Sequence, residues 1–228
     1  MIDAIGGVLL YLGLLAIVAG LLSAVYPLRF AGIRTRRRGL GVALAGVAAF
    51  ALGVYLPAPE VRVANPRTHL DEFAAVYQFS EYHSVLVHAP REKVDRALWQ
   101  VRPGEIRYFR TLMRMRGLRL PRADRPILDS FTSGWFRLLA DEPGREVVFG
   151  RTAPGIRIMM NFRMEDAEAG YTRLTTETRV YAVGTHMYHG FAAYWRMIRP
   201  GSGLIRKKWL RAIQQRAEAA AAEPAGTS

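Results

Sequence analysis

The sequence of 228 residues contains no cysteine. This absence excludes a disulfide framework, a thiolate zinc site and a cysteine nucleophile. Acidic residues are scarce relative to basic ones, with 19 Asp and Glu against 32 Lys and Arg, and the formal net charge is +13. Such a charge suits an anionic partner, either a phospholipid surface or a nucleic acid. The apolar segments described next favour the phospholipid surface, and we expect no nucleic-acid partner.

Charged side chains are absent from two long segments near the N-terminus. Residues 4–26 are long enough, as a helix, to cross a hydrocarbon core of about 30 Å. Residues 39–56 form a shorter uncharged segment that ends before Pro57 and Pro59, which cannot continue a helix. This second segment has no polar face at any helical phase, which argues against a buried helix of a soluble protein. Residues 1–57 therefore predict a hairpin of two transmembrane helices.

The loop between these segments, residues 27–38, carries five arginines. Because short loops rich in Lys and Arg stay in the cytoplasm, we expect this loop to be cytoplasmic and the rest of the chain to be extracytoplasmic, at a plasma or inner membrane. A cleaved signal peptide would need a basic stretch before the first segment and a small-residue cleavage site after it, and neither is present. Glycines recur along both segments and predict a close approach of the two helices. They are Gly6, Gly7, Gly13, Gly20, Gly39, Gly41, Gly46 and Gly53.

The sequence after the hairpin begins with a mixed stretch and then shows a strand followed by a helix. We interpret residues 58–80 as a linker that ends in a short helical stretch around 70–76. Residues 82–88 are rich in β-forming side chains and precede Pro90, which is well suited to the first position of a helix. Apolar residues then recur at i, i+3, i+4 and i+7 up to residue 101, a pattern typical of a helix lying on a sheet.

From residue 134 onward the apolar pattern changes to a period of two. Residues 135–140 and 145–150 flank the turn sequence Asp-Glu-Pro-Gly and predict one β-hairpin. Residues 156–164 and 173–180 alternate in the same way and predict a second β-hairpin.

The C-terminal part of the chain has helical spacing. Residues 188–198 and 204–217 are interrupted by Pro200 and Gly201, so they predict one long, kinked helix. The Ala-rich residues 218–228 predict a disordered tail.

Three segments carry a resemblance to a known superfamily. Residues 83–98, His-Ser-Val-Leu-Val-His-Ala-Pro-Arg-Glu-Lys-Val-Asp-Arg-Ala-Leu, look like its first strand and helix with an Ala-Pro junction. Residues 134–150 are similar to its central hairpin, and residues 191–206 look like the closing helix of a bacterial subgroup. In these segments and in the order of elements, residues 81–217 resemble the START-like superfamily, also called SRPBCC or helix-grip, here in a membrane-anchored form.

The resemblance implies an α+β fold in which a curved antiparallel sheet grips the long C-terminal helix around an apolar cavity. Members bind sterols, lipids, polyketides and plant hormones, and some are cyclases or hydroxylase subunits, so the fold does not fix the chemistry. If the fold is right, alternation along the strands and spacing along the helix assign the residues that face the cavity. They are Trp135, Phe149, Met160, Phe162, Thr176, Thr178, Tyr194 and Ile198. The alternative is that these side chains only pack in the hydrophobic core and line no cavity.

A basic amphipathic segment lies between the first helix and the hairpins, with apolar residues alternating with arginines. Its arginines predict a flap that rests on anionic headgroups and gates the cavity, and the alternative is a solvated charged face. The arginines are Arg107, Arg110, Arg114 and Arg116.

No catalytic or metal-binding set is identifiable in the sequence. His186 and His189 have no matching carboxylate, and no nucleophile elbow or phosphate-cradling glycine loop occurs. Glu105 and Asp129 are isolated candidates for an acid or base. We therefore expect no cofactor or metal. The leading hypothesis is a protein that binds a lipid or other hydrophobic small molecule near the bilayer. The alternatives are a cyclase- or hydrolase-type enzyme using the same cavity, and an interaction module whose cavity is filled.

Overall fold

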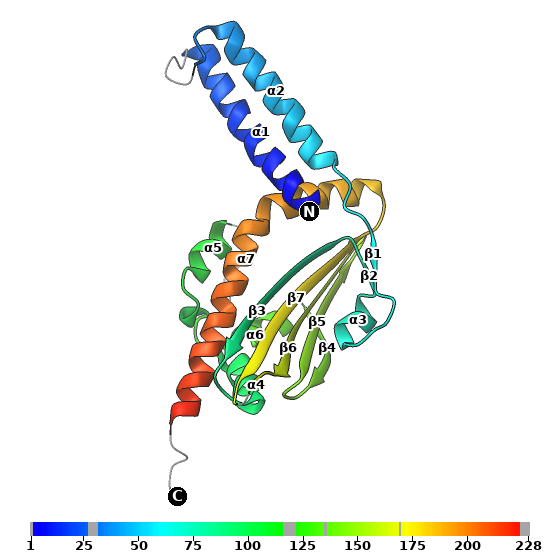
Figure 1. Ribbon diagram of the computed structural model, residues 1–228, viewed down its shortest axis with the longest axis vertical. Coiled ribbons are helices and arrows are strands. Elements are labelled where there is room, and N and C mark those ends of the chain that lie inside the picture. Colours follow the sequence, from blue (N-terminus) through cyan, green and yellow to red (C-terminus); the bar gives the residue numbers. More distant parts are fainter. Residues whose placement is uncertain (1, 27–31, 116–121, 135, 169, 224–228) are drawn as a thin grey trace, which may run out of the picture. The chain divides into compact units, whose positions relative to one another are not determined.

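The chain folds into two compact units in the computed structural model, which describes residues 2–26, 32–115, 122–134, 136–168 and 170–223. The first unit comprises Met1–Pro59 and Val183–Arg199, and the second comprises Glu60–Ala182 and Pro200–Ser228. The division between them falls inside the last helix, α7 (Thr185–Ala222), at Pro200 (Figure 1). The first part of α7 thus groups with the N-terminal helices.

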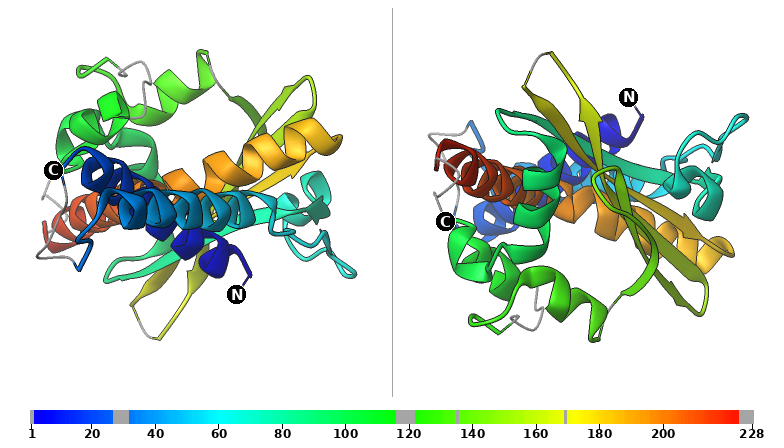
Figure 2. Two further views of the ribbon diagram at one scale, coloured as in Figure 1. Left: turned by 90° about the horizontal axis from the view of Figure 1, so that it is seen from above. Right: turned by 90° about the horizontal axis from the view of Figure 1, so that it is seen from below.

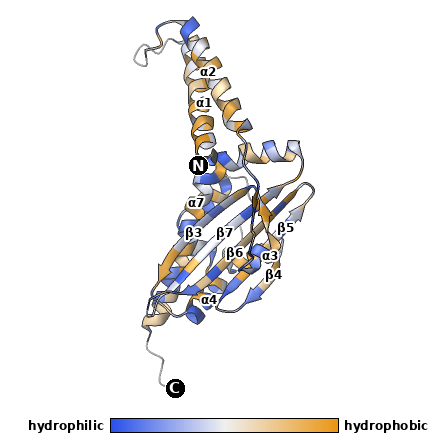
Figure 3. Cartoon of the chain, turned by 45° about the vertical axis from the view of Figure 1, so that its right-hand side comes forward, coloured by the Kyte–Doolittle hydropathy of each residue, from blue (hydrophilic) through white to orange (hydrophobic). Residues whose placement is uncertain are grey.

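The first unit is built on a hairpin of two apolar helices, α1 (Ile2–Val25) and α2 (Arg36–Tyr55). Thr35 begins α2, because its side chain accepts a hydrogen bond from the Arg38 amide at 3.3 Å. Both helices are long and apolar enough to cross a membrane by length and composition. Figure 3 shows that hydrophobic colours predominate along the pair. Many of their large apolar side chains, such as Leu15 and Leu44, are exposed.

Glycines hold α1 and α2 in close antiparallel contact, as predicted. A Cβ atom on Gly13 would lie 2.6 Å from the Phe50 nitrogen, and one on Gly46 would lie 2.7 Å from the Ile17 nitrogen. Gly6, Gly13 and Gly20 recur every seven residues on α1, as do Gly39, Gly46 and Gly53 on α2. A strict seven-residue repeat is typical of helices that wrap around each other in a left-handed supercoil. Gly41, which is outside this repeat, faces open space.

The second unit contains a five-stranded antiparallel sheet in the order β3-β7-β6-β5-β4. Its strands are β3 (Phe79–Val87), β4 (Arg137–Glu142), β5 (Glu146–Ala153), β6 (Ile156–Asp166) and β7 (Thr172–Ala182). The four strands β4 to β7 form successive hairpins, and β3 pairs along its whole length with β7. The predicted strands are therefore confirmed, and the register pairs Met160 with Thr178 and Phe162 with Thr176.

One face of the sheet, called the inner face below, packs on helices. These are α4 (Arg91–Gln100), α6 (Ile127–Thr132) and the second part of α7 (Figure 2). Fully buried side chains at the centre of this core include Phe149, Met160, Phe162 and Ile213. The predicted α+β class, with an antiparallel sheet packed on a long C-terminal helix, is confirmed for this unit.

The opposite, outer face is covered by residues 60–80, which were predicted to be a linker ending in a short helical stretch. The helix α3 (His69–Phe73) corresponds to that stretch, and the short strands β1 (Val61–Arg62) and β2 (Val76–Tyr77), which pair, were not predicted. A capping box begins α3, since Thr68 accepts from the Asp71 amide and Asp71 accepts from the Thr68 amide. Leu70 and Ala74 then pack on Val148 and Met159, so the segment is folded onto the sheet.

The predicted disordered tail also needs correction. Residues 218–222 continue α7, because alanine favours the helix and Glu218 accepts hydrogen bonds from the His88 amide at 2.9 Å and from Gln214 at 3.1 Å. Residues 224–228 lie outside the described residues.

The basic segment that carries Arg107, Arg110 and Arg114 follows a 3₁₀ turn, η2 (Pro103–Glu105), and includes the short helix α5 (Phe109–Met115).

Candidate functional site on the inner face of the sheet

Five polar side chains meet on the inner face, where apolar packing otherwise prevails. They are Glu81 and His83 on β3, Thr176 and Thr178 on β7, and Arg206 on α7, and they are called the inner polar cluster below. The register pairs Glu81 with Thr178 and His83 with Thr176, so all four strand residues project from the same face.

Arg206 is the centre of this cluster. Its Nη2 donates to the Thr178 hydroxyl at 2.8 Å, and its Nη1 donates to the Thr176 hydroxyl at 3.4 Å and also contacts the sulfur of Met160. The Thr176 hydroxyl in turn donates to the Asn161 carbonyl at 2.7 Å, so it is oriented to accept from the guanidinium. The Arg206 side chain is therefore held in one place over β6 and β7.

Glu81 and His83 form a pair beside Arg206. His83 Nε2 lies 3.1 Å from Glu81 Oε1, and the two side chains are 15% and 6% exposed, respectively. Gly203 lies one turn before Arg206 on the same face of α7, and a Cβ atom there would lie 2.8 Å from Glu81 Oε1. A glycine at this position therefore lets the helix approach β3 closely.

The surroundings of the inner polar cluster decide what it can do. Phe149, Met160 and Phe162 beside it are fully buried. A guanidinium near such side chains is costly to desolvate unless it is hydrogen-bonded, and its planar donors match a carboxylate or phosphate. The arrangement can therefore hold the anionic or polar head of an otherwise apolar molecule.

The structure brings five of the eight predicted cavity residues together. Phe149, Met160, Phe162, Thr176 and Thr178 lie on the inner face and are buried.

The other three predicted cavity residues do not join this group. Tyr194 and Ile198 fall in the other compact unit, and Tyr194 is 40% exposed. Trp135 lies outside the described residues.

Glu81, His83 and Arg206 were not predicted from the sequence. Arg206 does interrupt an apolar helical stripe of Ile205, Trp209 and Ile213, and such an interruption is a signal that sequence reasoning could use.

The predicted basic segment is amphipathic in the structure. Ile106 and Phe109 are buried in the inner core, whereas Arg107, Arg110 and Arg114 are exposed. Tyr108 is exposed and has a left-handed backbone with φ of 65°, and the Arg107 guanidinium lies 4.8 Å from the centre of its ring. Arg116 lies outside the described residues. Contact with a membrane stays a prediction for this segment.

The two acid or base candidates, Glu105 and Asp129, lie in different environments. Glu105 accepts from the Arg102 amide at 2.8 Å and pairs with Arg216 at 3.0 Å. Asp129 is exposed on α6. Within the described ranges no group of three or more histidines and acidic residues is placed to hold a metal ion. A role for either carboxylate as an acid or base stays a prediction.

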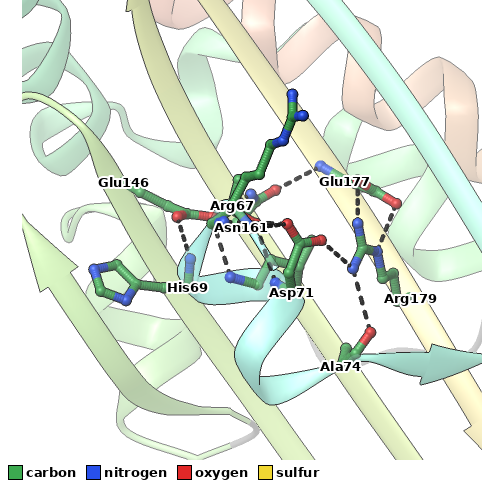
Figure 4. Close-up of polar contacts among 10 residues, drawn as sticks. Arg67, His69, Asp71, Ala74, Glu146, Asn161, Glu177 and Arg179 are labelled. Carbon is green, nitrogen blue, oxygen red and sulfur yellow. Dashed lines mark hydrogen bonds and ion pairs between the residues drawn. The ribbon is translucent and has the colours of Figure 1, made fainter. Parts of the chain in front are cut away.

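The outer face carries a second, separate polar network beneath α3 (Figure 4). Arg179 pairs with Asp71 at 2.8 Å and with Glu177 at 2.7 Å, and it also donates to the Ala74 carbonyl at 3.2 Å. Burial raises the pKa of Asp71, but hydrogen bonds from Arg67, Arg179 and Thr68 outweigh it and hold that pKa below its usual range. The network fastens α3 to the sheet.

Glu146 and Asn161 extend this network to the start of α3. Glu146 accepts from the backbone amides of His69 at 2.8 Å and Leu70 at 3.3 Å, and from the Asn161 side chain at 2.6 Å (Figure 4). These contacts satisfy the free amides at the beginning of the helix. The role of the network is therefore structural.

A pocket of about 330 Å³ opens beside this network on the outer face. Its walls are mostly charged, and the charges pair with one another, for example Arg145 with Glu142 and Arg163 with Glu165, each at 2.6 Å. A hydrogen bond to Glu72 raises the pKa of His69, which lies in the same wall. An apolar ligand would gain little from such walls.

Comparison with solved structures gives likenesses at low identity and low TM-score. An aromatase/cyclase, Zhui, from Streptomyces sp. R1128 is 14% identical, with 65% of this chain and 99% of that chain covered and a TM-score of 0.37. CalU16 from Micromonospora echinospora is 19% identical, with 71% and 92% covered and a TM-score of 0.31. A conserved protein from Geobacillus kaustophilus is 14% identical, with 62% and 97% covered and a TM-score of 0.37.

No family model matches the sequence, and no curated protein matches it. The likenesses to solved structures do not distinguish one function from another at these scores. Function is therefore argued below from the residues of this chain.

Proposed function

We propose that this chain is a membrane-anchored protein whose second unit binds a hydrophobic small molecule, such as a lipid, close to the bilayer surface. The observation that carries the proposal is the position of Arg206, which Thr176 and Thr178 hold against the apolar inner face. A ligand with a polar or anionic head and an apolar body would match both parts of this surface. The head would contact Arg206, and the body would contact side chains such as Phe149 and Phe162.

The dimensions and surface of the hairpin support the anchor. At 1.5 Å per residue the 24 residues of α1 span about 36 Å and the 20 residues of α2 about 30 Å, which matches a hydrocarbon core. Large apolar side chains face outward along both helices. The arginines at the start of α2 support an orientation with that turn in the cytoplasm and the second unit outside it.

The basic segment suits a gate at the membrane surface. Its exposed Arg107, Arg110 and Arg114 would meet anionic headgroups, while Ile106 and Phe109 tie the segment to the inner core. A movement of this segment would then expose the core to molecules from the bilayer.

Extraction of bound molecules from the purified full-length protein tests the proposal. Mass spectrometry of the extract should detect an intact hydrophobic molecule with the wild type and much less with Arg206→Met. The matched control is Arg173→Met, which removes an exposed arginine from β7 and should retain the ligand. Equal recovery from both variants would argue against the role of Arg206, and an empty wild-type protein would favour an interaction module with a filled core.

A second candidate is an enzyme of cyclase or hydrolase type that uses the same face. The Glu81–His83 pair favours it, because a protected carboxylate and imidazole at 3.1 Å beside a guanidinium can act as an acid or base. A chemically altered product in the same extract, lost in Glu81→Gln while ligand binding remains, would support this candidate. An unaltered ligand in both proteins would rule it out in favour of simple binding.

A further inference from the structure

The first part of α7, residues 185–199, belongs to the same compact unit as the hairpin and runs across one end of it (Figure 1). Arg196 makes the central contact and its side chain is fully buried. It donates to the carbonyls of Gly53 at 2.7 Å and Leu56 at 2.7 Å and pairs with Asp3 at 3.3 Å. A cation at this place also complements the negative end of the α2 dipole.

Other contacts join residues 185–199 to the same end of the hairpin. The Tyr188 hydroxyl donates to the Ala58 carbonyl at 3.0 Å, and the rings of His189 and Tyr55 lie 5.0 Å apart. The Tyr11 hydroxyl bonds to the carbonyl of Met197. These residues of α7 are therefore fixed to the end of the hairpin that is remote from the arginine-rich turn, which is the loop of residues 27–38 between the two apolar segments.

An apolar stripe remains exposed on residues 185–199. Met187, Gly190, Tyr194 and Met197 recur at intervals of three and four, so they share one side of the helix, and Met197 is 51% exposed. Arg196 and the buried Trp195 point to the other sides. Exposed apolar residues in a continuous stripe, with aromatic rings among them, are typical of a helix that lies at a membrane surface.

The contacts with α1 fix the depth of this stripe. A Cβ atom on Gly6 would lie 2.6 Å from Arg196 Nε, and Gly6 lies four residues, or about 6 Å, inside the start of α1. Interfacial helices bury their apolar face about 5–10 Å into the boundary between headgroups and acyl chains. If α1 and α2 cross the bilayer, residues 185–199 must then lie at this boundary.

We propose that residues 185–199 form an interfacial helix, with Met187, Tyr194 and Met197 inserted among the lipids on the side of the membrane opposite the arginine-rich turn. This inference rests on the proposed membrane anchor. The occupant of the stripe is the phospholipid bilayer, and Arg196 holds the helix against the hairpin at the right depth. The hairpin and the interfacial helix together would then set the orientation of the anchor in the membrane.

The absence of native cysteine allows a direct test with single labels. The full chain, carrying Met197→Cys or Met187→Cys with a bimane label, is reconstituted in phosphatidylcholine and phosphatidylglycerol vesicles. Quenching is measured with nitroxide lipids labelled near the headgroup or near the chain end, and with aqueous iodide. Leu15→Cys, in the middle of α1, reports on the anchor. Leu138→Cys, which is 43% exposed on β4, is the control for a position in the second unit.

We expect headgroup-proximal nitroxide to quench both α7 labels at least about twofold more than the Leu138 label. The Leu15 label should be quenched by the deep nitroxide. If iodide quenches the α7 labels as strongly as the Leu138 label while the Leu15 label is still quenched by lipid, the interfacial helix is refuted and the membrane anchor is not. Protection of the α7 labels from lipid and iodide would mean that protein, such as a second copy, covers the stripe, and would also overturn it. A Leu15 label untouched by lipid would refute the anchor itself.

Discussion

The Arg179 side chain joins the α3 segment to the sheet through Asp71 and the Ala74 carbonyl, and removing it should destabilise the second unit severely. It makes four hydrogen bonds at 2.7–3.2 Å to Glu177, Asp71 and the Ala74 carbonyl, and its guanidinium lies 4.7 Å from the centre of the Tyr77 ring. The side chains of Arg179 and Asp71 are only 8% and 10% exposed. Arg179→Met keeps most of the apolar part of the side chain but removes the positive charge, so the carboxylates of Asp71 and Glu177 lose their cationic partner.

Breaking a buried ion pair by removing one partner costs about 3–5 kcal/mol. With a urea m-value of about 2 kcal/mol per molar, this corresponds to a fall of about 2 M in the unfolding midpoint. The assay is urea unfolding of the full chain in detergent micelles, followed by tryptophan fluorescence, to which Trp99 and Trp209 of the second unit contribute.

The matched control is Arg145→Met, because Arg145 pairs with Glu142 at 2.6 Å but is 67% exposed. An exposed pair of this kind contributes about 0–1 kcal/mol, so its loss should hardly move the midpoint. The double variant Asp71→Asn/Arg179→Met should lose less than the sum of its single variants, since the two groups interact directly. Equal midpoints for Arg179→Met and Arg145→Met would refute the reasoning.

Three further predictions concern the hairpin and two titrating groups. Gly46→Leu should push α1 and α2 apart and lower the thermal stability of the protein in detergent, because its Cβ meets the Ile17 backbone, whereas Gly41→Leu should be neutral. Asp95→Asn should raise the urea midpoint at pH 7. Burial and then Asp141 raise the pKa of Asp95, and its Oδ1 has no hydrogen-bond partner among the described residues. The pKa of His69 is raised above 6.5 in the folded state. The contribution of the protonated His69 to folding stability is therefore fully present below pH 6.5, and it is lost as the pH rises through the folded-state pKa. Wild type should therefore lose more stability between pH 6 and 8 than His69→Asn, and equal losses would contradict the His69 contacts.

Much of the fold could be predicted because the apolar pattern changes period where the structure changes element. The alternation along residues 156–164 predicts a strand with one buried face, and β6 buries Met160 and Phe162 on that face.

Contacts between distant segments could not be predicted in this way. The folded segment 60–80 depends on Asp71 meeting Arg179, 108 residues later, and no local period encodes that pairing. The place of residues 183–199 in the first unit likewise depends on Arg196 reaching Gly53 and Leu56.

The apolar part of the candidate site and its two threonines, Thr176 and Thr178, could be predicted from the sequence. Alternation identified Phe149, Met160 and Phe162, since a face of a strand can be read from its sequence. The other three members of the inner polar cluster, Glu81, His83 and Arg206, were not predicted because they come from opposite ends of the domain. Their meeting depends on the pairing of β3 with β7 and on the close approach at Gly203.

The proposed function is tested most directly by the headgroup preference of ligand binding. Two fluorescent acyl probes with the same chain, one with a carboxylate head and one with a neutral methyl ester, are titrated against the full-length protein in detergent. A charge-assisted hydrogen bond contributes about 1.5–3 kcal/mol, so the wild type should bind the carboxylate probe at least about tenfold more tightly. Arg206→Met should lose this preference and still bind the ester, whereas Arg173→Met should keep it. Equal affinity of the wild type for both probes, or a preference that survives in Arg206→Met, would contradict the account.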